Sequence, residues 1–242
     1  MTGLDDARRL IAEASSIAVL TGAGIIAESG IPTFRGTGGM WGNFRAEDLA
    51  TPEAFARDPK FVWEWYQARR GEIAKCEPNA GHRALVAMEE AADEFTLITQ
   101  NVDGLHDRAG SKRVLKIHGD IWMTRCVACG YQRLNHDLGM ELPPQCGECG
   151  GLVRPGVVWF GEMLPRIVWE EAERAVNRCD LLLVVGTSAQ VYPAAGLIDL
   201  ARNAGASTVE VNLEATAYSS AVDISLRGKA AEVLPLVVGG LG

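Results

Sequence analysis

The sequence predicts an α/β fold in which a doubly wound parallel sheet carries a smaller inserted domain. Short apolar segments alternate along the chain with longer amphipathic ones, which is the pattern of strands and helices in such a sheet. The first apolar segment runs directly into a glycine-rich turn. Two stretches, residues 33–76 and 123–154, break the alternation, and the second holds four cysteines. We therefore expect these two stretches to form the inserted domain.

The expected strands are short and mostly apolar or β-branched, as in parallel strands that are buried on both faces. They cover residues 17–21, 95–100, 114–118, 157–160, 181–186 and 208–212. The expected helices cover residues 4–14, 59–75, 81–92, 166–178 and 193–204. The sheet domain should then comprise residues 1–32, 77–122 and 155–242, and the small domain residues 33–76 and 123–154.

Composition and charge narrow the class of protein. The 242 residues are 48% hydrophobic, enough for a sizeable core, yet no apolar run approaches the roughly 20 residues of a membrane span. Asp5, Asp6 and Glu13 interrupt the apolar stretch that a secretory signal needs, so we expect a cytoplasmic protein. The net charge of −8 disfavours direct binding to nucleic acid or to a membrane and favours basic partners such as lysine-rich protein segments. We expect a monomer.

Four cysteines form the most specific pattern in the chain. Cys126, Cys129, Cys146 and Cys149 form two C-x-x-C pairs separated by sixteen residues. Each pair places two thiolates on one side of a tight turn, and the two pairs complete the tetrahedron that zinc prefers. Because four protein ligands leave no position for water, we expect one structural zinc ion in a helical and zinc-ribbon domain. Two disulfides are the alternative, but they need an oxidising compartment.

The strand expected at residues 17–21 leads into Gly22-Ala23-Gly24-Ile25-Ile26-Ala27, a G-x-G-x-x-A turn. At a strand-to-helix turn this pattern is typical of Rossmann-type dinucleotide sites, because glycines let the backbone approach a pyrophosphate and a helix N-terminus attracts its charge. A plain tight turn is the alternative. A dehydrogenase would carry an acidic residue at the end of a second strand about 20 residues later. Further glycines stand there instead, so the loop favours NAD but argues against hydride transfer.

Polar residues stand at the ends of four later strands. They are Gln100, Asn101 and Asp103; His118; Gly186, Thr187 and Ser188; and Asn212. Because ligands bind beyond the carboxyl ends of parallel strands, we expect these residues to share one rim. His118 is a candidate general base, since an ordinary histidine pKa near 6.5 suits proton transfer at neutral pH. Each residue alone is compatible with a cap or a turn, but four strand ends together favour a site.

As an ordered set, these motifs resemble the sirtuins, the NAD-dependent protein lysine deacylases. The matching segments are residues 22–25, 28–35, 99–106, 118–119, the four cysteines, 154–162, 186–188 and Asn212, and they span nearly the whole chain. The resemblance implies a Rossmann-type domain and a smaller zinc-bearing domain, with NAD and an acylated lysine of a protein or peptide meeting in the cleft. It also implies nicotinamide and O-acyl-ADP-ribose as products.

The resemblance assigns expected roles to individual residues. His118 would take a proton from a ribose hydroxyl once the acyl oxygen has displaced nicotinamide, and Asn101 is the second catalytic candidate. Residues 157–162 would pair with the substrate backbone as an added strand, with contacts from Val157, Val158, Phe160 and Gly161. The implied cofactor contacts are Gly22, Ala23, Gly24, Ile25, Glu28, Phe34, Arg35, Gln100, Asn101, Val102, Asp103, Gly186, Thr187, Ser188, Asn212, Leu213 and Ala230.

A second resemblance concerns the acyl group. Tyr66 and Arg69 resemble the Tyr-x-x-Arg signature of class III sirtuins, which remove succinyl, malonyl or glutaryl groups as well as, or better than, acetyl. Residues three apart share one face of a helix. A guanidinium binds a carboxylate with two hydrogen bonds, and a phenol adds a third. An exposed arginine beside a core aromatic residue is the alternative.

One position departs from the family pattern. Ile26 stands where the family usually has serine, so a hydroxyl able to bond a phosphate or the adjoining loop is absent. We expect weaker NAD affinity with the mechanism intact. Two other functions stay open from the sequence: transfer of ADP-ribose to protein, and a zinc- and NAD-binding interaction module without catalysis.

Overall fold

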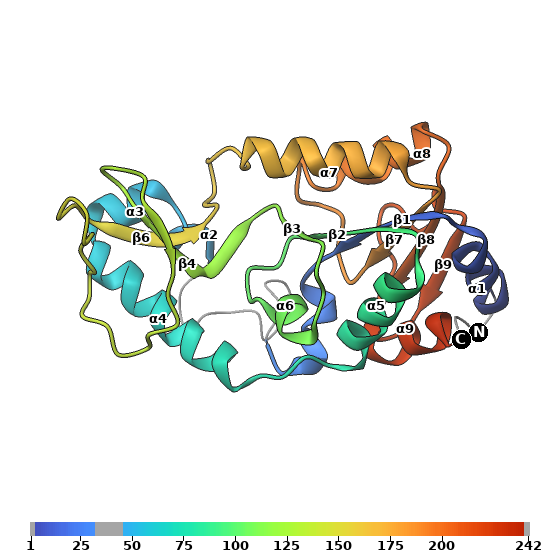
Figure 1. Cartoon of the computed structure of the whole chain (residues 1–242), viewed down its shortest axis with the longest axis horizontal. Helices are drawn as coiled ribbons and strands as arrows, with labels where there is room; N and C mark the ends of the chain where they lie inside the picture. Colours follow the sequence, from blue (N-terminus) through green and yellow to red (C-terminus); the bar gives the residue numbers. More distant parts are fainter. Residues whose placement is uncertain (1–2, 32–45, 240–242) are drawn as a thin grey trace.

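The computed structural model describes residues 3–31 and 46–239, and the structural statements below concern these ranges. Figure 1 shows an elongated molecule with a large sheet at one end and a small sheet at the other. The two chain ends lie together beside the large sheet (Figure 1). In the described ranges no helix combines the length and the apolar character needed to cross a bilayer.

The large sheet confirms the α/β prediction. Its strands are β1 (Ser16–Thr21), β2 (Glu94–Thr99), β3 (Val114–Lys116), β7 (Leu181–Val185), β8 (Ser207–Asn212) and β9 (Ile224–Arg227). They are all parallel, in the order β3-β2-β1-β7-β8-β9. The order reverses between β1 and β7, and this topological switch point is where such sheets bind ligands.

Helices cover both faces of the large sheet (Figure 1). One face packs against α1 (Leu4–Glu13), α5 (Ala80–Ala91) and α9 (Ala230–Val238), and the other against α7 (Arg166–Arg178) and α8 (Gly196–Asn203). Successive residues of β1 point to opposite faces of the sheet. Val19 packs in the core on the α1, α5 and α9 side, and Leu20 packs in the core on the α7 and α8 side. Burial on both faces explains why the strands lack the alternation of an exposed sheet.

The small sheet is antiparallel and three-stranded. It contains β4 (Gly119–Cys126), β5 (Gln132–Leu134) and β6 (Val153–Val157), in the order β5-β4-β6. Three helices accompany it: α2 (Ala46–Leu49), α3 (Pro52–Arg57) and α4 (Pro59–Lys75). Asp58 caps the N-terminus of α4, because its carboxylate accepts the backbone N–H of Phe61. The Trp63 indole anchors the helix by donating to the Val153 carbonyl.

Two expectations about elements need correction. The strand expected at residues 157–160 is wrong, because β6 ends at Val157 and belongs to the small antiparallel sheet. Strands β4, β5 and β9 and helices α6 (Leu105–Ala109) and α9 lie outside the predicted elements. Since β4 already begins at Gly119, the small sheet starts before the boundary expected at residues 122–123. The assignment of residues to two domains stays a prediction.

Candidate functional site

The glycine turn lies at the switch point of the large sheet, but its geometry differs from the expectation. After β1 the chain forms two 3-10 turns, Ala23–Ile25 and Ala27–Ser29, instead of an α-helix. A Cβ built on Gly24 would lie 2.6 Å from the Cα of Gly186, where φ is +59°. The two backbones therefore touch, and glycine is required at both positions by the packing of the protein itself.

The polar strand ends meet at one rim, as their order in the sheet predicts. The Asn101 side-chain amide donates to the Gly22 carbonyl at 3.0 Å, and that of Gln100 donates to the Thr187 hydroxyl at 3.0 Å. From β8, the Asn212 amide donates to the Thr187 carbonyl at 3.3 Å. Side chains from β2, β7 and β8 are thereby held around the glycine turn.

His118 follows β3 at the same rim. Its Nδ1 lies 3.0 Å from the Gln100 carbonyl, and a carbonyl oxygen only accepts, so Nδ1 carries the hydrogen and Nε2 keeps its lone pair. Burial lowers the pKa of His118 despite the opposing effect of this hydrogen bond. The imidazole is therefore neutral at pH 7, with one bare nitrogen available to accept a proton.

A buried polar network, which sequence reasoning missed, stands behind Asn101. The His106 Nε2 lies 3.1 Å from the Thr21 hydroxyl, which donates to the Thr99 hydroxyl at 2.8 Å. Thr99 in turn accepts the backbone N–H of Asn101 at 3.0 Å. The His106 ring lies 4.9 Å from that of His82, and burial lowers the pKa of both histidines. Two threonines at the last positions of neighbouring strands were the available signal.

Asp103 is buried close to the small domain. Its Oδ1 accepts the Leu105 backbone N–H at 2.8 Å, and its backbone carbonyl accepts the Trp122 indole at 2.8 Å. Burial raises the pKa of Asp103, whereas hydrogen bonds from the backbone N–H groups of Leu105 and of Asp103 itself, and the charge of Arg69, lower it. Asp103 is thus electrostatically linked to the helix that carries Tyr66.

The other predicted cofactor residues lie around the same loops. Glu28 accepts the backbone N–H of Ala231 at 3.0 Å, so it caps α9 and lies beside Ala230. The side chains of Ala23, Ile25 and Val102 all pack in the core on the α1, α5 and α9 side of the sheet. Leu213 is exposed. Phe34 and Arg35 lie outside the described residues.

Helix α4 carries Tyr66 and Arg69, and both are buried, with 4% and 2% of their surface exposed. The alternative of an exposed arginine is therefore wrong. The Tyr66 hydroxyl accepts the Trp159 indole N–H at 2.9 Å. Burial lowers the pKa of Arg69 to about 9, which leaves the guanidinium charged at neutral pH.

The adjacent Arg70 has a different environment. It donates to the backbone carbonyls of Ile121 and Asn135 at 2.8 and 2.9 Å. Its guanidinium lies 5.4 Å from the centre of the Trp63 ring and 5.5 Å from that of Trp122. Arg70 thus fastens α4 to the small sheet.

The segment expected to pair with substrate lies beside His118. The Val158 backbone N–H donates to the His118 carbonyl at 2.9 Å, and that of Phe160 donates to the Ala50 carbonyl at 2.9 Å. Val157 is buried at the end of β6, Gly161 has a φ of +84°, and half of the Phe160 surface is exposed. The segment is fixed at both ends, although it forms no strand.

The four cysteines converge as predicted, with all sulfur atoms within 4.8 Å of one another. Cys126 lies 3.5 Å from Cys149, and Cys129 lies 3.8 Å from Cys146. Zn–S bonds of about 2.3 Å in a tetrahedron place sulfurs roughly 3.8 Å apart, whereas a disulfide needs about 2.05 Å. The geometry fits one zinc ion and does not fit disulfides.

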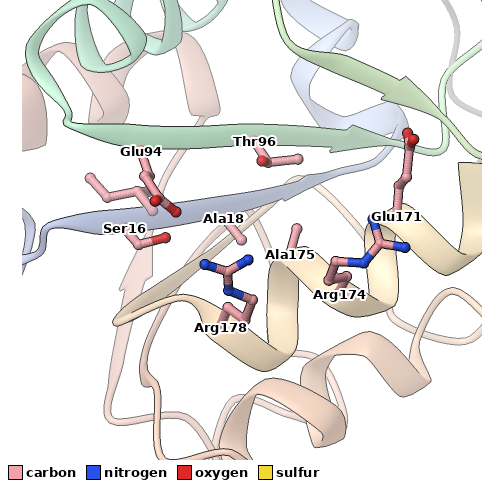
Figure 2. A pocket seen from close by; sticks show the side chains of 9 residues that line it. Ser16, Ala18, Glu94, Thr96, Glu171, Arg174, Ala175 and Arg178 are labelled. Atoms are coloured by element: carbon pink, nitrogen blue, oxygen red, sulfur yellow. The ribbon is translucent and has the colours of Figure 1, made fainter.

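A surface groove lies at the N-terminal ends of β1 and β2, away from the glycine turn that follows β1 (Figure 2). Glu94, Glu171, Arg174 and Arg178 mix both charges along it, and Ser16 marks the first residue of β1. Its volume is about 190 Å³, below the roughly 300–1,000 Å³ of small-molecule sites. The groove is therefore no candidate for a dinucleotide site.

Comparison with known proteins identifies the family. Residues 22–193 match the model of the Sir2 family. The chain belongs to the Sir2 family. This Sir2 protein is 53% identical to the "NAD-dependent protein deacylase" of Aquifex aeolicus (strain VF5), over 92% of this chain and 93% of the relative. It is 51% identical to "NAD-dependent protein deacylase 2" of Pyrobaculum aerophilum, over 95% and 92% of the two chains.

Solved structures of Sir2 proteins share the fold. A Sir2 homologue in complex with NAD has a TM-score of 0.93 and 45% identity, covering 98% of this chain and 93% of that one. A Sir2 variant solved with a deacetylated p53 peptide and 3′-O-acetyl ADP ribose has a TM-score of 0.86 and 32% identity, covering 98% of each chain. The resemblance to sirtuins is therefore confirmed, while its class III subdivision stays a prediction.

Proposed function

We propose that this Sir2 protein is an NAD-dependent protein lysine deacylase that removes succinyl and malonyl groups, and also acetyl. The observation that carries the proposal is the contact between His118 and Gln100. It holds a neutral imidazole with a bare nitrogen at the rim, next to Asn101 and the glycine turn. The activity named for the relatives agrees with this arrangement.

The residues at the rim fit NAD as the co-substrate. Asp103 Oδ2 is buried, and the described residues give it no hydrogen-bond partner. A buried acceptor in this state suits the amide N–H of nicotinamide. NAD supplies the ADP-ribose to which the acyl group is transferred. We assign the ribose and nicotinamide side to Gln100, Asn101, Val102 and Asp103, and the remaining contacts to Gly22, Ala23, Gly24, Ile25, Glu28, Gly186, Thr187, Ser188, Asn212, Leu213 and Ala230.

His118 is the proposed general base. Its bare Nε2 accepts the proton of a ribose hydroxyl, and its protonated Nδ1 stays on the Gln100 carbonyl to stabilise the resulting cation. The Val158 N–H donates to the His118 carbonyl, so a backbone hydrogen bond joins the proposed substrate segment to the residue that carries the base. Val157, Val158, Phe160 and Gly161 are the proposed substrate contacts.

The preference for acidic acyl groups rests on Tyr66 and Arg69. Both are buried, and Arg69 is charged. Removal from water strengthens the attraction between a guanidinium and a carboxylate. A succinyl or malonyl carboxylate accepts hydrogen bonds from both side chains, whereas the methyl group of an acetyl offers no acceptor.

The products test this function. Mass spectrometry of a reaction with an acyl-lysine peptide and NAD should detect O-acyl-ADP-ribose and free nicotinamide. His118→Ala should abolish O-acyl-ADP-ribose, because the base acts after nicotinamide has left. Attachment of ADP-ribose to the protein substrate, without free O-acyl-ADP-ribose, would instead support a transferase. Neither product would support an interaction module.

A further inference from the structure

The proposed acyl-binding pair, Tyr66 and Arg69, has a third member in the proposed substrate segment. The Nε1–H of Trp159 points at the Tyr66 hydroxyl and donates to it at 2.9 Å, and Trp159 has 3% of its surface exposed. Trp159 and Tyr66 come from the β6–α7 segment and from α4, so this bond joins the substrate segment directly to the acyl pocket.

Trp159 itself is held from three sides. Its backbone N–H donates to the Glu162 carboxylate at 2.8 Å, and Glu162 forms a two-point ion pair with Arg154. The Arg154 guanidinium lies 3.4 Å from the centre of the Trp159 ring, and the Phe55 ring packs at 5.2 Å. The indole therefore has little rotational freedom, and the direction of its N–H is set by the fold.

The Trp159 indole determines the direction in which the Tyr66 hydroxyl can donate its hydrogen. Burial raises the pKa of Tyr66, so the phenol stays protonated at neutral pH. A phenol has one hydrogen to donate, and Trp159 occupies an acceptor position on the oxygen, which turns that hydrogen elsewhere. The described part of the chain gives this hydrogen no acceptor. A ligand carboxylate beside Arg69 supplies one.

We propose that Trp159 is a specificity-determining positioning residue: its indole N–H orients the Tyr66 hydroxyl as a donor to the distal carboxylate of succinyl- or malonyl-lysine. This inference rests on the proposed function, because it concerns the acyl pocket of the same site. It adds that selectivity for acidic acyl groups is set partly from the substrate segment and not by α4 alone.

A double-mutant cycle tests the inference. Trp159→Phe keeps an aromatic ring but removes the N–H, and Tyr66→Phe removes the hydroxyl that accepts it. The measured quantity is the ratio of kcat/KM for matched succinyl- and acetyl-lysine peptides. We expect Trp159→Phe to lower this ratio about three- to tenfold, the size of one hydrogen bond, and to lower it no further in a Tyr66→Phe background.

Two controls separate hydrogen bonding from packing and folding. Phe55→Leu disturbs the packing on Trp159 without removing its N–H, so it should change the turnover of both peptides by the same factor. If Trp159→Phe lowers the thermal unfolding temperature into the assay range, a tryptophan analogue with sulfur in place of the ring N–H, incorporated at position 159, preserves the volume and removes the donor.

The outcomes distinguish this inference from the function beneath it. A wild-type enzyme that prefers succinyl, combined with additive effects of the two substitutions or an unchanged ratio in Trp159→Phe, would overturn the role of Trp159 alone. A wild-type enzyme that prefers acetyl would overturn the acidic-acyl pocket and this inference together. Absence of NAD-dependent turnover of either peptide would overturn the deacylase assignment.

Discussion

His118 and Gln100 are joined by a hydrogen bond of 3.0 Å from an imidazole Nδ1 to a backbone carbonyl. The contact fixes the tautomer of the base, because only the protonated nitrogen can face a carbonyl. Gln100 follows β2 and His118 follows β3, so the end of β2 supports the base on the neighbouring strand.

The burial of His118 predicts the pH dependence of turnover. Burial lowers the pKa of His118 below its ordinary value, so the neutral, active form persists below pH 6.5. We expect kcat/KM to be flat near pH 7 and to fall only below pH 6.5, as the imidazole becomes protonated. The exposed His136, which stacks on Trp122, provides the control: His136→Ala should keep the same acid limb. An acid limb centred above pH 6.5 would contradict the role of His118.

The buried network behind Asn101 predicts an effect on chemistry. Thr21→Val preserves shape but removes the hydroxyl between His106 and Thr99. We expect kcat to fall about three- to tenfold, because Asn101 loses its fixed support. Thr21→Ser retains the hydroxyl and should restore most of the rate. Equal kcat values for the valine and serine variants, measured well below their unfolding temperatures, would show that the network does not contribute to catalysis.

Substitutions of the adjacent residues Arg69 and Arg70 should have different effects: one should change acyl selectivity and the other the free energy of unfolding. Arg70→Leu leaves two buried carbonyls without their donors, so we expect the free energy of unfolding to fall by about 2–4 kcal/mol. Arg69→Met should instead reduce kcat/KM for succinyl peptides about 10- to 100-fold, the value of a charge-assisted bond, with a much smaller effect on acetyl peptides. Denaturant titration and peptide kinetics on both variants check this division. Reversed effects would show that the pocket arginine is misassigned.

Substitution of Ile26 should change both the KM for NAD and the free energy of folding. Its side chain is 2% exposed and belongs to the core cluster on the α5 and α9 side. We expect Ile26→Ser to lower the KM for NAD, and also to cost about 2–4 kcal/mol of folding free energy, since it leaves a cavity and a buried hydroxyl. Ile26→Val should lose less stability and keep the wild-type KM. An unchanged KM in the serine variant would reject a role for the missing hydroxyl.

The sequence predicted best what depends on local pattern. Five of the six strands of the parallel sheet and the long helices α4 and α7 were predicted from apolar runs and amphipathic segments, and the cysteine spacing predicted the observed convergence. The strands it missed lie in the small sheet or at an edge: β5 has three residues, all exposed, and β9 has four. Such strands are held by pairing and turns, so their apolar signal is weak.

The missed parts of the site depend on contacts between distant residues. Trp159 meets Tyr66 across 93 positions of sequence, and His106 meets Thr21 across 85. Apart from the threonines that end β1 and β2, the sequence carries no local sign of such pairs. The glycine turn shows a different limit: its motif suggested a helix and ligand approach, whereas the structure has 3-10 turns and backbone packing between Gly24 and Gly186.

The most direct test of the account is turnover of matched acetyl- and succinyl-lysine peptides by the wild-type protein, with and without NAD. The account predicts that both reactions require NAD, that they release nicotinamide, and that the succinyl peptide has the higher kcat/KM. Deacylation without NAD, or no deacylation with it, would contradict the central claim.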